Sequence, residues 1–204
     1  MNKPSCQNSS LSIALTIPTL IPYDYAMKIA AVDIGSNGIR LVIAKYDEVL
    51  KKIRIPLRLG TESFGPTQEF SDSTIKYTTE VFKSIATLLK DEDVEQYRIV
   101  ATSAFRNAKN SEALAEIIES ETTLKIEKIN GDDEAKLVLK SVLNNMTLKP
   151  TRDYLLVDLG GGSIEFSKKD GEKSIESKSF ELGTVRLMNY IKSVNGDKKL
   201  IRDK

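Results

Sequence analysis

The hydrophobic pattern of this 204-residue chain contains two similar apolar runs, each ending in an aspartate and followed by a turn with glycines. The first run leads into Asp33 and the sequence IGSNGIR, and the second leads into Asp158 and LGGGSIE. Each is followed by a second strand-like run, a polar turn and a third run. The pattern therefore predicts an internal duplication, in which each half contains strand, turn, strand, turn and strand.

In the first half, the pattern predicts an antiparallel meander, followed by a surface loop at 61–70, which contains Gly65 and Pro66. A helix with apolar residues at helical spacing comes next, with Ser71, Asp72 or Ser73 as its N-cap. A short strand parallel to the first strand, a helix capped by Ser111 and a further strand complete this half. The predicted strands are 28–33, 39–46, 50–59, 97–102 and 124–129, and the predicted helices are 71–90 and 111–120.

In the second half, the pattern predicts a helix that begins at Asn130 and has Ala135, Leu139 and Val142 on its apolar face. It continues with a buried strand at 154–157, strands at 164–167 and 174–182, and a helix at 185–191. The charged stretch 197–204 then ends the sequence, so we expect a fragment or a truncated gene product. The predicted fold class is α/β with two related βββαβα halves. The first half is 27–129, and the second, which is incomplete, is 130–204.

Residues 1–26 do not resemble the rest of the chain, and we expect a disordered leader or a natural start at Met27. The apolar run 11–21 is too short to span a bilayer and is interrupted by Pro18. The segment has no clear cleavage site, which argues against a signal peptide.

Composition excludes several kinds of chemistry. The 30 basic and 29 acidic residues nearly balance, which argues against nonspecific nucleic-acid binding. A single cysteine, Cys6, cannot form an intrachain disulfide. Since the chain has no histidine, Ser-His-Asp catalysis, Cys-His catalysis and histidine-rich zinc sites are excluded. Carboxylates, lysines, tyrosines and hydroxyls remain as acid-base groups.

Gly160, Gly161, Gly162 and Ser163 directly follow a strand that ends at Asp158. Consecutive glycines let backbone N–H groups approach a phosphate, and a strand-end carboxylate can hold the hard cation that accompanies phosphates. The alternative is a glycine-rich hairpin turn with an ordinary terminal aspartate. The second copy of the pattern favours the first interpretation, because two such loops can clamp a polyphosphate between two halves.

Two further segments are expected beside these loops. ATSAFRNAKN follows the parallel strand, and its Arg106 could pair with a phosphate or with a local carboxylate. The helix that opens with Asp132, Asp133 and Glu134 precedes the Asp158 strand. Acidic residues at a helix start commonly complement the macrodipole, which is the interpretation we favour for Asp132 and Asp133. A carboxylate at Glu134 could instead orient or deprotonate water.

Five ordered motifs, AAVDIGSNGIRLVIA, VATSAFRNAKN, INGDDEAKLV, LLVDLGGGSIEF and ELGTVRL, resemble the exopolyphosphatase and guanosine pentaphosphate phosphohydrolase (Ppx/GppA) family. The resemblance implies an actin-like (ribonuclease H-like) ATPase fold. It also implies a cytoplasmic hydrolase that removes the terminal phosphate from polyphosphate or guanosine pentaphosphate with Mg²⁺. The implied partners are polyphosphate or guanosine penta- or tetraphosphate and a second subunit in a homodimer, with neither nucleic acid nor membrane.

Carried over to this chain, the family motifs imply one role for each matching residue. Glu134 activates the attacking water, while the carboxylates that organise metal and water are Asp33, Asp158 and Glu165. The residues implied to bind phosphate are Ser36, Asn37, Gly38, Arg106, Gly160, Gly161, Gly162 and Ser163. Three positions depart from the family pattern, where Gly38 replaces a serine, Asp133 a glutamate and Ile164 a threonine.

The residues and the resemblance predict the same reaction, in which water held by Glu134 attacks a terminal phosphoryl group in line. A phosphoenzyme on Asp33 or Asp158 is less favoured, because a strand-end aspartate in such a loop serves a metal more naturally. A noncatalytic polyphosphate- or nucleotide-binding module is the main alternative. A sugar or acetate kinase shares the fold but is disfavoured by Glu134 and by ELGTVRL.

Overall fold

A computed structural model describes residues 27–46, 48–145, 152–170 and 175–195. The predicted leader, the charged C-terminal stretch and part of the predicted turn at Asp170 and Gly171 lie outside these ranges. Within them, no helix combines the length and the apolar character needed to cross a bilayer.

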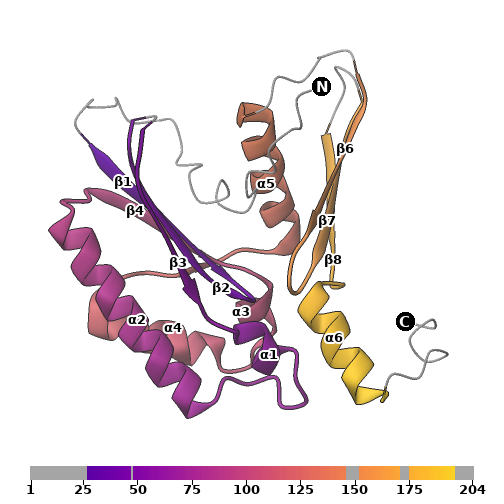
Figure 1. Cartoon of the computed structure of the whole chain (residues 1–204), viewed down its shortest axis with the longest axis horizontal. Helices are drawn as coiled ribbons and strands as arrows, with labels where there is room; N and C mark the ends of the chain where they lie inside the picture. The colour runs from indigo at the N-terminus through magenta and orange to yellow at the C-terminus, as the bar shows by residue number, and fades with distance from the viewer. Residues whose placement is uncertain (1–26, 47, 146–151, 171–174, 196–204) are drawn as a thin grey trace.

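The first half is built on a five-stranded mixed sheet in the order β3-β2-β1-β4-β5. Strands β1 to β4 of this sheet are labelled in Figure 1. Strand β1 lies at its centre, antiparallel to β2 and parallel to β4, as predicted. Both faces of β1 are covered, which explains why its sequence is apolar almost throughout. The strands are β1 Lys28–Gly35, β2 Gly38–Lys45, β3 Glu48–Pro56, β4 Gln96–Ala101 and β5 Glu127–Lys128.

Helices α2 (Asp72–Asp91) and α4 (Ser111–Thr122) cover one face of this sheet (Figure 1). Alternate residues of β1, including Val32, join Phe82 of α2 and Leu114 of α4 in the main hydrophobic core. Such burial is the dominant favourable contribution to folding.

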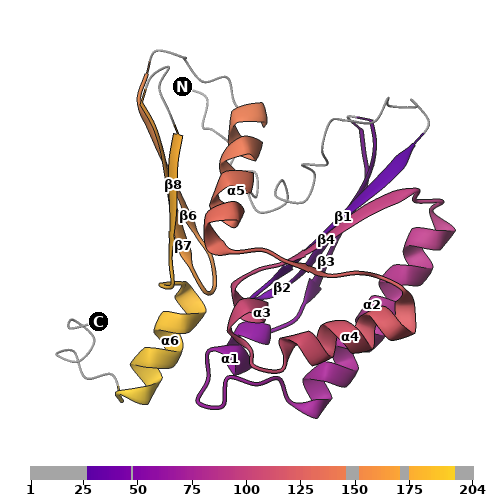
Figure 2. The same ribbon diagram turned by 180° about the vertical axis from the view of Figure 1, so that it is seen from behind.

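Helix α5 (Gly131–Asn145) lies between the two sheets (Figures 1 and 2). Ala31 and Val100 on the second face of the first sheet form a smaller core with Val138 of α5, against which Leu156 of β6 also packs. Because α5 also packs against β7 and β8, it connects both halves. The predicted Ala135 and Leu139 are buried, whereas Val142 is half-buried.

The second sheet is an antiparallel meander in the order β6-β7-β8, and helix α6 (Thr184–Ser193) follows it. Its strands are β6 Tyr154–Leu159, β7 Ile164–Lys169 and β8 Ile175–Phe180. The predicted repeat of strand, turn, strand, turn and strand is thus confirmed in both halves. The boundary between domains at 129 and 130 stays a prediction.

The expectation that β6 is fully buried was wrong. Leu155, Val157 and Leu159 are 65%, 48% and 57% exposed. With Asp158 aligned on Asp33, Val157 corresponds to Val32, whose face of the sheet is covered by α2 and α4 in the first half. No described helix covers the corresponding face of the second sheet (Figure 2).

The predicted loop at 61–70 is partly helical, because α1 (Leu59–Ser63) occupies its start. Leu59, Gly60 and Ser63 are buried, and the Gly60 amide donates to the carbonyl of Ser36 at 2.9 Å. Helix α1 is a short helix held by tertiary contacts, so it has too few residues to show a helical period. Its glycine favoured the prediction of a loop.

Ser71 caps α2 as predicted, since its hydroxyl accepts a hydrogen bond from the amide of Thr74. Ser111 does not cap α4, because it is the first helical residue and Asn110 occupies the cap position. The Asn110 side chain instead binds the backbone N–H and C=O of Phe70, which ties α4 to the preceding loop. The predicted strand at 124–129 is reduced to β5, which pairs over two residues at the sheet edge.

Candidate active site

The two glycine-containing loops are both hairpin turns, and they touch. A two-residue turn joins β1 to β2, with Gly35 opposite Gly38. Residues 160–163 join β6 to β7, where the Gly160 amide donates to the Ser163 carbonyl at 2.9 Å. A Cβ atom on Gly161 would lie 2.8 Å from the Cβ of Ser36, so this contact requires glycine.

Gly162 is held still more tightly, against the first half. A Cβ atom there would lie 2.3 Å from both Phe64 Cζ and Ser103 Oγ. Close packing between the halves accounts for this glycine, and it does not line the cavity beside the turns. Phosphate binding by Gly162 stays a prediction.

A cavity of about 110 Å³ lies where the turns meet. Strand ends, turns and the start of α5 contribute to it, as the topology predicted. The predicted site residues that line it are Asp33, Ser36, Asn37, Gly38, Glu134, Asp158, Gly160, Gly161, Ser163 and Glu165. Of the predicted set, Arg106 and Gly162 do not line it.

Four carboxylates are therefore gathered in one small space. Burial raises the pKa of Asp33 to about 6, although Arg40 Nη1 lies 3.0 Å from its Oδ2 and opposes the shift. Burial also raises the pKa of Asp158 and that of Glu165. Glu165 accepts a hydrogen bond from Ser179 Oγ at 2.8 Å, which fixes its orientation.

Glu134 stands in the first turn of α5 and forms an ion pair with Arg106 of α3 (Ser103–Asn107), at 2.9 Å. Burial raises the pKa of Glu134 to about 7, and its acidic neighbours Glu165 and Asp33 add to the shift against the opposing charge of Arg106. Arg106 also donates to the carbonyl of Ile129 at 2.8 Å. Its partner is thus a carboxylate, the alternative foreseen from the sequence, and phosphate binding by Arg106 stays a prediction.

Asp132 and Asp133, the other acidic residues at the start of α5, make contacts that are typical of a helix N-terminus. Asn130 Oδ1 accepts from the Asp133 amide at 2.9 Å, and the Asp133 carboxylate pairs with Lys136. Asp132 accepts a long hydrogen bond from the Ser179 amide, and neither aspartate lines the cavity.

The carboxylates suit a cation that takes most of its ligands from elsewhere. Within the described ranges, no group of three or more acidic residues is close enough to hold a metal ion alone. Mg²⁺ commonly binds through one or two carboxylates, with waters and substrate phosphates as its remaining ligands. Asp33, Asp158 and Glu165 line the cavity and offer such oxygens, so this donor set fits Mg²⁺.

The cavity is also lined by four residues for which no role was predicted from the sequence, Arg40, Arg54, Thr102 and Ser103. Ser103 Oγ lies 3.1 Å from Ser36 Oγ, so it places a second hydroxyl beside that of the first turn. The position of Thr102 and Ser103 after a parallel strand was a usable signal. A two-residue hairpin turn also places Arg40 opposite Asp33, whereas the place of Arg54 depends on the β2–β3 register.

The chain is similar to a family of known phosphatases. Residues 42–199 match the Ppx/GppA phosphatase family, and the chain belongs to that family. The structure of a family member from Aquifex aeolicus is 29% identical, with a TM-score of 0.68 over 87% of this chain and 58% of that chain. An exopolyphosphatase from Cytophaga hutchinsonii is 25% identical, with a TM-score of 0.72 over 80% of this chain and 53% of that chain. The predicted actin-like ATPase fold is confirmed.

A bifunctional 3-dehydroquinate synthase/phosphatase from Fusobacterium nucleatum subsp. nucleatum is 29% identical over 170 residues. The match covers 78% of this chain and 25% of that protein. The chain thus spans a quarter of this relative and little more than half of the structural relatives.

Proposed function

We propose that this protein is a phosphoanhydride hydrolase that releases terminal orthophosphate from inorganic polyphosphate, guanosine pentaphosphate or both. One observation carries the proposal, namely that four carboxylates and both hairpin turns line a single cavity. Membership of the Ppx/GppA phosphatase family supports it.

Glu134 is the residue we assign as general base. Its raised pKa, about 7, makes it a better proton acceptor than an ordinary glutamate once it is ionised. The ion pair with Arg106 fixes the carboxylate at the cavity wall, beside Asp33, Glu165 and the turns. It accepts a proton from water while the water oxygen attacks the terminal phosphorus, and the shortened chain leaves with the bridging oxygen.

The remaining residues hold the phosphoryl group. The hydroxyls of Ser36, Ser103 and Ser163 line the cavity and can donate to phosphate oxygens. Mg²⁺, when bound, would reduce the repulsion between phosphate oxygens and the carboxylates of Asp33 and Asp158.

The proposal is tested by measuring orthophosphate release from polyphosphate and from guanosine pentaphosphate with Mg²⁺. Parent protein and Glu134→Ala are compared, with Glu116→Ala as a control, because Glu116 is an exposed glutamate of α4 outside the cavity. We expect release by the parent and the control and a loss of at least about 100-fold in Glu134→Ala. Equal rates in all three would refute the role of Glu134.

The second candidate is a module that binds polyphosphate or a guanosine phosphate without turnover. Tight binding of either substrate without phosphate release would support it. Transfer of the phosphoryl group to an added sugar or acetate, rather than to water, would instead indicate a kinase.

The family also leads us to propose a cytoplasmic location and a homodimer. Light scattering on the purified protein tests the second of these.

A further inference from the structure

Two arginines line the cavity, and they differ in what neutralises them. Arg40 lies on β2 and pairs with Asp33. Arg54 lies directly opposite Arg40 on the edge strand β3 and is exposed. Within the described ranges, no carboxylate or other polar group is within bonding distance of the Arg54 guanidinium.

Like charges directly opposite each other on neighbouring strands are destabilising. The pair of Arg40 and Arg54 therefore carries a cost that nothing in the described chain offsets at Arg54. An anion at the guanidinium of Arg54 would relieve this repulsion, and a planar guanidinium binds phosphate through two parallel hydrogen bonds.

The order of the sheet gives the cavity a direction. Glu134 lies in α5, close to the end of β4. Arg106, in the helix that follows β4, forms an ion pair with Glu134. Asp33 lies on the central strand β1, and Arg54 lies on β3 beyond β2. The cavity thus extends from the proposed base, past Asp33, to an exposed arginine at the sheet edge.

We propose that Arg54 binds the phosphates that follow the cleaved one, so that a linear chain of phosphates leaves the cavity across the β3 edge. The inference rests on the proposed function, since it assumes that the terminal phosphate lies beside Glu134. Arg54 thereby selects substrates that carry at least one further phosphate over those with a single phosphate. The selection depends on the polyphosphate chain and not on a base or sugar.

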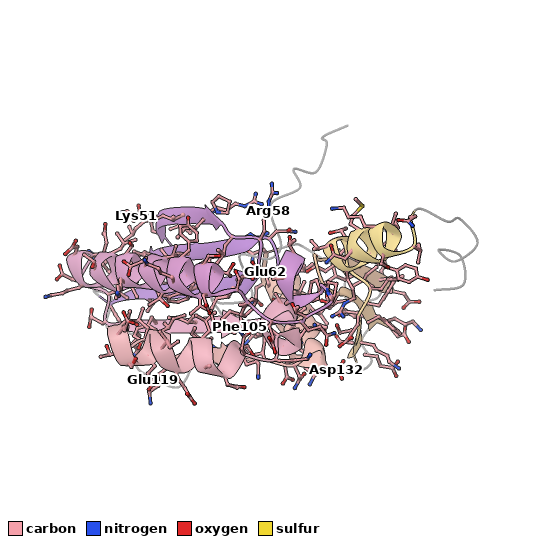
Figure 3. The ribbon with its side chains drawn as sticks, turned by 90° about the horizontal axis from the view of Figure 1, so that it is seen from below. Lys51, Arg58, Glu62, Phe105, Glu119 and Asp132 are labelled. Carbon is pink, nitrogen blue, oxygen red and sulfur yellow. The ribbon has the colours of Figure 1, made fainter. Side chains whose placement is uncertain are left out.

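The test compares parent protein, Arg54→Gln and Arg58→Gln. Arg58, which is labelled in Figure 3, is a matched control. It is an exposed arginine close to Arg54 in the sequence, and it does not line the cavity. Calorimetry measures binding of tripolyphosphate and of orthophosphate with Mg²⁺, and initial rates give kcat and KM for tripolyphosphate.

We expect Arg54→Gln to weaken tripolyphosphate binding and raise its KM by about tenfold, the effect of one charge-assisted hydrogen-bonded contact. Its affinity for orthophosphate and its kcat should change by less than about twofold, and Arg58→Gln should resemble the parent throughout.

The outcomes separate this inference from the proposed function. Phosphate release with the same tripolyphosphate KM in parent and Arg54→Gln would overturn the subsite and leave the hydrolase standing. Binding that depends on Arg54, without release, would support the subsite and overturn the hydrolase. An equal loss of affinity in Arg54→Gln and Arg58→Gln would show general electrostatic attraction, and it too would overturn the subsite.

Discussion

Glu134 combines burial, an ion pair and several acidic neighbours in one side chain. Its side chain is 12% exposed, and its pKa is about 7. Near neutral pH the group can therefore exist in either form, and small changes in its surroundings shift the balance. The function proposed for it requires the ionised form, whereas burial favours the neutral one.

The pH dependence of turnover follows from this requirement. A general base must be unprotonated, so kcat/KM should rise with pH through about 7 and level off above it. Initial rates between pH 5 and pH 9 at saturating Mg²⁺ measure this. Rates that fall over the same interval would mean that Glu134 acts in its protonated form, as an acid.

The same shift has a consequence for stability. The folded-state pKa is above the ordinary value of 4.5, so from about pH 4.5 upward the unfolded chain releases this proton before the folded one does. Stability should therefore decrease as pH rises through that window. Glu134→Gln mimics the neutral form and should gain on the order of 2 kcal/mol relative to the parent at pH 8, and close to nothing at pH 4.

Urea unfolding of both proteins at the two pH values measures this difference, and Glu116→Gln controls for loss of an exposed charge. A gain of the same size at pH 4 and pH 8 would disprove the link to ionisation.

At the scale of elements, the two hairpin turns are the parts that assemble the cavity. The sequence pattern correctly predicted the antiparallel meander of the first half, its repeat in the second half and the parallel β4. The features that the pattern did not predict depend on contacts between elements. Helix α1 forms because Leu59 and Gly60 dock under the first turn, and no local period reveals such a contact.

The glycines of the second turn should differ in their tolerance of a methyl group. Gly162→Ala would place Cβ 2.3 Å from Ser103 Oγ, whereas Gly160→Ala would meet its nearest atom, the Ser163 carbonyl oxygen, at 3.3 Å. We expect Gly162→Ala to lose roughly 1–3 kcal/mol of stability, and Gly160→Ala clearly less. Thermal unfolding of both variants measures the difference, and equal losses would contradict the contact between turn and first half.

At the scale of the whole molecule, α5, the second hairpin turn and α6 all contact the first half, and Arg186 of α6 makes several of these contacts. Arg186 Nε donates to the Gly162 carbonyl at 3.1 Å, and Nη1 donates to Asn107 Oδ1 at 3.2 Å. Its guanidinium also lies 4.3 Å from the centre of the Phe64 ring. Burial lowers the pKa of Arg186 from its usual value.

Arg186→Ala should loosen α6, because none of its residues is fully buried and Arg186 supplies contacts of several kinds. Amide hydrogen exchange in 184–193 should become at least about tenfold faster than in the parent. Lys192→Ala, an exposed substitution on the same helix, serves as control. Unchanged exchange in Arg186→Ala would show that α6 is held without this residue.

Most of the cavity could be predicted from the sequence, because strand ends and the internal repeat place Asp33, Asp158 and their turns together. Arg54 could not be placed, since its position depends on the register between β2 and β3, which shifts between Ile43 and Ala44 of β2. The packing role of Gly162 could not be predicted either, because only the assembled halves show what lies against that residue.

The central claim is that water, placed by Glu134, attacks the terminal phosphorus. Hydrolysis of tripolyphosphate in ¹⁸O-labelled water, followed by mass spectrometry of both products, tests it most directly. The account predicts one ¹⁸O atom in the released orthophosphate and none in the pyrophosphate, with labelling lost in Glu134→Gln. Label in the pyrophosphate, or release that persists in Glu134→Gln, would contradict it.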